Sequence, residues 1–300
     1  MADFEVISGK KDLLGENPLW DIENGELWWT DIIGKMVYSY NPVKGIIRER
    51  LSGLSVSSFA FIKGGGLICG CLEGLYHWSE NGGFIRIADI FDGEALTIND
   101  GIADARGRFL FGTNYYDEKR SDYRLGKLFS FDGRTGILSV LDEGVHLSNG
   151  LGFSSDNSII YYTDTVARVI FRYRYDPEKG SVSGKEVFVK VPENEGIPDG
   201  LTVDSEDFVW SAQWYGECIV RYDPDGAVWK KIAVPAKQVT SLVFGGDELS
   251  DIYVTSASKV WRSPLAPPGY DYNSGNTGGS LYRCNFGIRG RPENFAVAPR

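Results

Sequence analysis

Glu26-Leu-Trp-Trp-Thr30 recurs in altered form along the chain and decides the fold. The other copies are Gly66-Leu-Ile-Cys-Gly70, Arg108-Phe-Leu-Phe-Gly112, Ile159-Ile-Tyr-Tyr-Thr163, Phe208-Val-Trp-Ser211 and Asp251-Ile-Tyr-Val-Thr255. Short runs of β-branched and aromatic residues bounded by Gly, Asn and Asp are typical of β-strands. The copies recur about every 41 to 50 residues, which is the period of a four-stranded propeller blade.

A second strand follows each copy of the first. Its six copies are Met36-Val-Tyr-Ser-Tyr40, Gly74-Leu-Tyr-His-Trp78, Lys127-Leu-Phe-Ser-Phe131, Val169-Ile-Phe-Arg-Tyr173, Cys218-Ile-Val-Arg-Tyr222 and Ser280-Leu-Tyr-Arg-Cys284. Turn residues such as Asn41-Pro42 and Asp132-Gly133 end many of them. A shorter segment, such as Gly200-Leu-Thr-Val-Asp204, precedes each pair and is interpreted as the innermost strand.

These repeats predict an all-β fold, a six-bladed β-propeller with four-stranded antiparallel blades, as one domain over residues 1–300. The sixth repeat lacks an outer strand after Cys284, and Phe4-Glu-Val-Ile7 is expected to supply it and close the ring. Residues 264–279, rich in Pro, Gly and Asn, are expected to form a long loop within the sixth blade.

Composition narrows the possible partners and the location. A net charge of −10 repels phosphate backbones, which argues against nucleic acid as a partner. No apolar run is long enough to cross a membrane, and Met1 to Lys10 lacks the pattern of a signal peptide. The four cysteines form no CxxC pair and are expected to be reduced, so the protein is predicted to be cytoplasmic. A monomer or weak homo-oligomer is expected.

Aligning the six repeats on the turn after the innermost strand reveals one polar position. Five residues before that turn, the repeats carry Glu16, Ser57, Asn99, Asn149, Asp199 and Thr240. Equivalent positions at the start of the inner strands of a propeller ring one mouth of its tunnel, so these side chains should converge. The ring contains no Lys or Arg to compensate its two carboxylates. A hard divalent cation would do so, whereas capping of turns is the alternative reading.

At these residues the chain resembles the family of senescence-marker protein 30 (regucalcin), gluconolactonases and other sugar-lactone hydrolases. The resemblance covers nearly the whole chain. It rests on Gly15-Glu16-Asn17-Pro18-Leu19-Trp20, Asn99-Asp100-Gly101, Ser148-Asn149-Gly150-Leu151, Ile197-Pro198-Asp199-Gly200 and the segment from Pro235 to Gly246.

The resemblance implies a six-bladed propeller with one divalent metal ion, Ca²⁺, Zn²⁺, Mn²⁺ or Fe²⁺, in the tunnel mouth. The family ligands match Glu16, Asn149 and Asp199, and a nearby Asn that contacts substrate or water matches Asn99. Two positions depart from the family pattern: an Arg that is frequent in gluconolactone-hydrolysing members is Thr97 here, and a Glu is Asp117. The sugar preference therefore cannot be carried over.

Further substrate contacts are expected from the loops at the mouth. Tyr115 and Asp117 follow the second strand of the third blade, and the matching place in the fifth holds Gln213, Trp214 and Tyr215. Their aromatic faces could stack on a sugar ring, although packing between blades is the alternative. His146, three residues before Asn149, is a candidate substrate contact or a solvated loop histidine.

The expected function is that of a metal-dependent hydrolase opening a small-molecule sugar lactone, an aldonolactone, to the aldonic acid. In this scheme water attacks a metal-polarised carbonyl, with Asp199 as the catalytic base. The chain has only two histidines and no Gly-x-Ser-x-Gly motif, which argues against a Ser-His-Asp hydrolase. The alternatives are a phosphotriesterase or aryl-esterase on the same propeller, and a non-enzymatic calcium-binding propeller.

Overall fold

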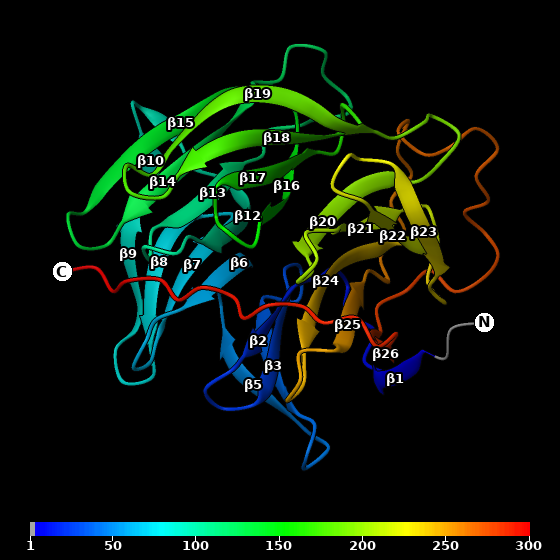
Figure 1. The fold of residues 1–300 in the computed structure, drawn as a ribbon, viewed down its shortest axis with the longest axis horizontal. Helices are drawn as coiled ribbons and strands as arrows, with labels where there is room; N and C mark the ends of the chain where they lie inside the picture. The colour runs from blue at the N-terminus through cyan, green and yellow to red at the C-terminus, as the bar shows by residue number, and fades with distance from the viewer. Residues whose placement is uncertain (1–3) are drawn as a thin grey trace.

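The computed structural model describes residues 4–300, which form six four-stranded antiparallel sheets arranged in a ring (Figure 1). The predicted six-bladed β-propeller is thereby confirmed. The described residues contain no helix that is long and apolar enough to cross a membrane. The cytoplasmic location, the oligomeric state and the single domain over residues 1–300, of which 1–3 lie outside the described residues, stay predictions.

Each of the first three blades is a four-stranded meander whose strands pair in chain order. Blade 1 consists of β2 (Gly15–Asp21), β3 (Glu26–Asp31), β4 (Met36–Asn41) and β5 (Ile46–Ser52). Blade 2 consists of β6 (Val56–Phe61), β7 (Leu67–Cys71), β8 (Gly74–Ser79) and β9 (Gly83–Ala88). After a hairpin of β10 (Ile90–Phe91) and β11 (Glu94–Ala95), blade 3 consists of β12 (Ile98–Ala103), β13 (Phe109–Thr113), β14 (Gly126–Asp132) and β15 (Ile137–Val145).

The last three blades follow the same plan up to the point where the ring closes. Blade 4 consists of β16 (Ser148–Phe153), β17 (Ile159–Asp164), β18 (Val169–Asp176) and β19 (Ser181–Lys190). Blade 5 consists of β20 (Ile197–Val203), β21 (Val209–Trp214), β22 (Cys218–Tyr222) and β23 (Val228–Ala233). Blade 6 consists of β24 (Val239–Gly245), β25 (Asp251–Ser256), β26 (Leu281–Asn285) and β1 (Glu5–Ser8).

The N-terminal strand closes the ring as predicted. β1 pairs antiparallel with β26, with Glu5 opposite Arg283 and Val6 opposite Tyr282. A side-chain ion pair of 2.6 Å joins Glu5 and Arg283 across the same pair of strands. Pairing the N-terminal strand β1 with β26 gives blade 6 its full set of four strands.

Asp residues fix the turns that follow the innermost strands. The Oδ1 atom of Asp204 accepts hydrogen bonds from the backbone N–H groups of Glu206 (2.9 Å) and Phe208 (3.0 Å). Its Oδ2 atom accepts from the Trp210 indole at 2.8 Å and from Arg221 Nε at 2.9 Å, all inside the blade. Asp is favoured in turns because its short side chain can satisfy backbone donors in this way.

The core lies mainly between neighbouring blades rather than at the centre of the ring. Trp210 of blade 5 meets Phe244 of blade 6 edge to face, with ring centroids 5.6 Å apart. Trp20 of blade 1 stacks on Tyr253 of blade 6 at 5.8 Å. Because the large apolar side chains fill the gaps between sheets, the tunnel along the axis remains available for polar groups.

The C-terminal segment, residues 286–300, crosses the face of the ring where these turns lie (Figure 1, red). Backbone hydrogen bonds tie it to blade 6 at Leu249, to blade 5 at Ser205, to blade 2 at Phe61 and to blade 3 at Gly107. Arg291 adds side-chain hydrogen bonds to the carbonyls of Phe153 and Ser154 in blade 4. This strap was not predicted from the repeats. It covers the end of the tunnel opposite the one where the polar ring residues lie.

Candidate functional site

A β-bulge at the start of each innermost strand places the polar ring residues. The strand register shifts between Glu16 and Leu19, Val56 and Ser58, Ile98 and Asp100, Asn149 and Leu151, Pro198 and Leu201, and Val239 and Leu242. A bulge leaves a residue out of the ladder and re-aims its side chain. The same irregularity in all six blades therefore explains why one alignment position is polar throughout.

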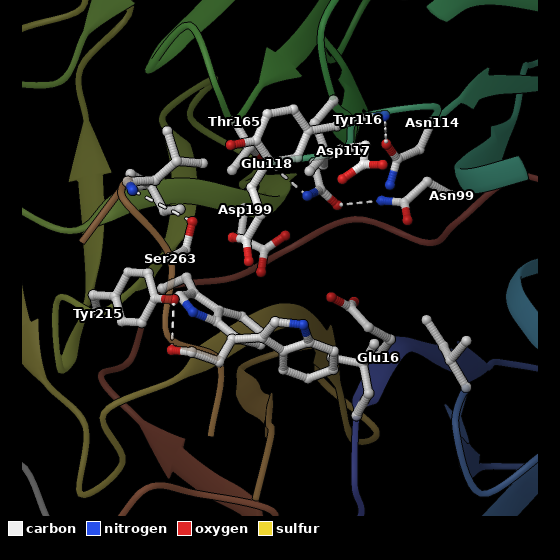
Figure 2. Close-up of a pocket in the computed structure, with 18 of the residues that line it drawn as sticks. Glu16, Asn99, Asn114, Tyr116, Asp117, Glu118, Thr165, Asp199, Tyr215 and Ser263 are labelled. Carbon is white, nitrogen blue, oxygen red and sulfur yellow. Dashed lines mark hydrogen bonds between the residues drawn. The ribbon is translucent and has the colours of Figure 1, made fainter. Parts of the chain in front are cut away.

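Four of the six ring residues line a cavity of about 630 Å³ at the mouth of the tunnel, here called the mouth cavity. These are Glu16, Asn99, Asn149 and Asp199, and the labelled Glu16, Asn99 and Asp199 point toward a common space (Figure 2). Ser57 and Thr240 instead join blades: Ser57 donates to the carbonyl of Ile98 at 2.8 Å, and Thr240 donates to the carbonyl of Gly15. Four of the six predicted residues are therefore candidates for function, and Ser57 and Thr240 hold neighbouring blades together.

Hydrogen bonds fix the two amides of this set. Asn99 Nδ2 donates to the carbonyl of Ser148 at 2.8 Å and to Asn149 Oδ1 at 3.2 Å. Asn149 Nδ2 donates to Thr165 Oγ1 at 3.0 Å, and Thr165 Oγ1 in turn donates to the carbonyl of Pro198 at 2.7 Å. Each nitrogen is engaged by the protein, and Asn149 Oδ1 accepts one hydrogen bond but keeps a second lone pair, so the amide oxygens are the atoms that can meet a ligand.

Among the described residues, no Lys or Arg side chain pairs with the carboxylates of Glu16 and Asp199. Burial, and then the charge of Asp100, raises the pKa of Glu16 to about 8, opposed by a hydrogen bond from the Asn17 backbone N–H. Burial, followed by the charges of Glu16 and Asp100, raises the pKa of Asp199 well above its ordinary value. Burial also raises the pKa of Asp100 to about 7. Such shifts mean that ionising these carboxyls together is costly unless a positive charge compensates them, which is typical of functional sites.

The donor set fits a hard or borderline divalent cation. Carboxylate and amide oxygens are the ligands that such ions take, and a cation would relieve the repulsion between Glu16 and Asp199. Asp199 and Asn149 are only 5% and 6% exposed, whereas Glu16 and Asn99 are half-buried. Within residues 4–300, no three His, Cys, Asp or Glu side chains are grouped to hold a metal, so an amide must complete any ligand set here.

Loops of blades 3, 5 and 6 supply most of the polar and aromatic wall of the mouth cavity, and blades 1 and 4 add Leu14, Ile32 and Leu147. Blade 3 contributes Asn114, Tyr116, Asp117, Glu118 and Lys119 from the loop after β13. Blade 5 contributes Trp214 and Tyr215 at the end of β21. Blade 6 contributes Trp261, Ser263 and Leu265 from residues 257–280 between β25 and β26, a loop that contains the predicted 264–279 and begins seven residues earlier.

Of the predicted substrate contacts, Asp117 lines the cavity with Asn99, but three others do not. The Tyr115 hydroxyl donates to the carbonyl of Ala95 at 2.6 Å, and its ring lies under Arg124. His146 Nδ1 lies 2.7 Å from the Tyr123 hydroxyl. Thr97 is half-buried, and its carbonyl accepts from the Asn114 backbone N–H at 2.9 Å. Substrate contact by these three residues stays a prediction.

Comparison with known proteins places the whole site in context. The family model described as "SMP-30/Gluconolactonase/LRE-like region" matches residues 14–258. The chain is 37% identical to the pentonolactonase XacC of Haloferax volcanii over 93% of both chains. A calcium-binding protein, regucalcin, from Agrobacterium tumefaciens has a solved structure that is 25% identical and superposes with a TM-score of 0.83, covering 98% of this chain and 97% of that one. A solved luciferin-regenerating enzyme gives a TM-score of 0.89 at 24% identity, covering 99% and 100% of the two chains, which shows the shared fold.

Proposed function

The chain belongs to the SMP-30/gluconolactonase family. From that premise we propose that it hydrolyses sugar aldonolactones with one divalent metal ion at the floor of the mouth cavity, which is the part lined by Glu16, Asn99, Asn149 and Asp199. The observation that carries the proposal is the convergence of Glu16, Asn99, Asn149 and Asp199 in one cavity, where no Lys or Arg among the described residues pairs with either carboxylate. A metal-holding floor in a concave cavity suits a small polar substrate that must be held close to a Lewis acid.

Glu16, Asn149 and Asp199 would hold the metal. When bound there, Ca²⁺, Zn²⁺, Mn²⁺ or Fe²⁺ would supply polarisation of the lactone carbonyl and stabilise developing negative charge. The hydrogen bond from Asn149 Nδ2 to Thr165 turns the amide so that its oxygen can act as a ligand. Glu16 and Asp199 come from blades 1 and 5, so the site exists only when the ring is closed.

Asp199 is the proposed catalytic base. It accepts a proton from water as the water oxygen forms a bond to the lactone carbonyl carbon. The bond between that carbon and the ring oxygen then breaks, and the ring oxygen takes up the proton to become a hydroxyl group. The product is the open-chain aldonic acid, with no covalent enzyme intermediate.

Asn99 and Asp117 position the reactants in this scheme. The Asn99 amide nitrogen is held by Ser148 and Asn149, which leaves its oxygen to accept a hydrogen bond from water or a sugar hydroxyl. Asp117 is half-buried in the cavity wall and can accept hydrogen bonds from further hydroxyls. The substrate in this scheme is a small-molecule sugar lactone with several hydroxyl groups.

The test is to strip the protein with chelator and follow acid release from a panel of pentono- and hexonolactones as single metals are added back. Unaided ring opening is subtracted with protein-free controls. We expect metal-restored turnover on one or two lactones, loss of it in Asp199→Asn, and no loss in Asp122→Asn, an exposed carboxylate outside the cavity. Absence of turnover with every lactone and metal, or normal turnover of Asp199→Asn, would overturn the proposal.

A further inference from the structure

The mouth cavity is larger than a simple sugar lactone needs. Its volume of about 630 Å³ lies within the range of roughly 300–1,000 Å³ that holds drug-sized ligands. A five- or six-carbon lactone has only about 10–12 non-hydrogen atoms, well below the size of such ligands. With the lactone ring at the floor, near Glu16 and Asp199, much of the cavity would remain unfilled.

The walls above the floor differ in chemical character. The blade 3 side carries the ionisable side chains Asp117, Glu118 and Lys119. The opposite side, from blades 5 and 6, carries Trp214 and Trp261, whose ring centroids lie 5.6 Å apart at an interplanar angle of 68°. Both indoles are half-buried and border the cavity. Aromatic faces bind the apolar face of a flat or ring-shaped group, and their area dominates binding energetics.

The aromatic wall is fixed in place rather than loosely attached. The Trp261 backbone N–H donates to Gln238 Oε1 at 3.1 Å, and the Trp261 carbonyl accepts from the Tyr215 hydroxyl at 2.9 Å. Gln238 is 1% exposed, and its Nε2 donates to the carbonyls of Ala257 and Lys259 at 3.0 and 2.7 Å. A buried side-chain amide thus holds the start of the loop through three backbone groups.

A second anchor ties the loop to the segment that carries the base. Arg168 is 8% exposed, and its Nη2 donates to the carbonyl of Leu265 at 2.6 Å. Its Nη1 donates to the carbonyl of Gly196 at 3.1 Å, three residues before Asp199. The aromatic wall and the floor are therefore held in a constant relation, which lowers the ordering cost of binding a ligand that touches both.

We propose that the wall formed by Trp214 and Trp261 is a second sugar subsite, and that the preferred substrate is the lactone of a disaccharide aldonic acid. The lactone ring lies at the floor beside Glu16 and Asp199, and the second sugar ring packs against Trp261. The hydroxyls of the second ring face the Asp117 side of the cavity. This inference rests on the proposed lactonase function and adds to it the size of the substrate.

The experiment compares kcat/KM for gluconolactone with kcat/KM for its β-1,4-glucosylated counterpart, in wild type and in Trp261→Ala. Loss of one aromatic contact of about 1.4 kcal/mol predicts an approximately tenfold lower kcat/KM for the disaccharide lactone. The value for gluconolactone should change by less than about twofold, because that substrate does not reach the wall. Trp229→Ala, which removes a 64% exposed indole on the outer strand β23, is the matched control and should change neither value.

A binding measurement protects the test from a folding defect in Trp261→Ala. The disaccharide aldonate should bind wild type about tenfold more tightly than gluconate, and Trp261→Phe should keep most of this difference. Equal effects of Trp261→Ala on both lactones, or equal affinities for the two aldonates, would overturn the second subsite. Failure of wild type to open either lactone would instead refute the proposed function itself, so the two failures are distinguishable.

Discussion

Thr165 should control metal affinity without touching the metal, and replacing it by Val tests how the floor is organised. Thr165 is only 4% exposed. Its hydroxyl accepts a hydrogen bond from Asn149 Nδ2 at 3.0 Å and donates one to the carbonyl of Pro198 at 2.7 Å. It therefore links the proposed amide ligand to the backbone just before Asp199. Val has nearly the same shape but can make neither hydrogen bond.

Two magnitudes follow from this geometry. Leaving buried polar groups unpaired costs about 1–3 kcal/mol, which should lower the free energy of unfolding by that amount. Losing a hydrogen bond that orients a metal ligand weakens metal binding by about 10–100-fold. The second effect is the larger one for function, because Asn149 can then rotate its oxygen away from the site.

The assay is competition of the chelator-stripped protein with a chromogenic metal indicator, together with urea unfolding of the same sample. Thr165→Ser keeps the hydroxyl and should bind the metal within a few-fold of wild type. If Thr165→Val bound the metal as tightly as wild type while remaining folded, the hydrogen bond to Asn149 would have no part in organising the floor, and Asn149 would lose its place in the ligand set.

Three further predictions concern parts of the propeller outside the mouth cavity. Burial raises the pKa of Asp12 from 3.8 to about 7, so the contribution of this carboxyl to stability is present below pH 4 and is lost as pH rises through 7. Asp12→Asn should flatten the dependence of the unfolding free energy on pH in this range, by at most about 1.4 kcal/mol per pH unit. An unchanged slope in urea titrations would refute this prediction. Arg291→Ala should lower the free energy of unfolding by about 1–3 kcal/mol through loss of the hydrogen bonds to Phe153 and Ser154, measured by urea titration, and an unaltered midpoint would deny the strap a stabilising role. Cys69 and Cys71, fully buried with raised pKa values, should react with a thiol reagent only after denaturation, and rapid labelling of the native protein would contradict their placement.

The fold and the floor of the site could be predicted because both repeat. A propeller puts equivalent residues of its blades at equivalent distances from one axis. Residues that align between the repeats therefore also lie close to one another around that axis. The bulge that recurs in all six inner strands keeps that position constant. Ser57 and Thr240 share the position but have short hydroxyl side chains, which reach neighbouring backbone carbonyls instead of the axis.

Asp117, Trp214 and Tyr215 were expected at the mouth and do line the cavity, but the blade 6 part of the wall could not be predicted because it does not repeat. Trp261 and Leu265 lie in a loop that only the sixth blade has, and no second copy indicates where that loop turns. Tyr115 misses the cavity because its hydroxyl donates to the carbonyl of Ala95 and its ring lies under Arg124, contacts that the sequence does not reveal.

His146 likewise lies against the Tyr123 hydroxyl, 2.7 Å from its Nδ1, and not in the cavity lining. Asp100 was quoted only as part of a motif, although its charge acts on both Glu16 and Asp199. Asp100 raises the pKa values of Glu16 and Asp199 because it is buried near them in the tunnel, and the repeat pattern does not predict that burial.

The most direct test of a metal-dependent lactonase built on these residues is one titration with two readouts. Metal-free protein is titrated with a single divalent metal, and the heat of binding and the turnover of a lactone are measured at each addition. We predict that turnover rises in proportion to occupancy, reaches its limit at one metal per chain, and is lost together with binding in Glu16→Gln. Full turnover of the metal-free protein, or Glu16→Gln that binds and turns over as wild type does, would contradict the account.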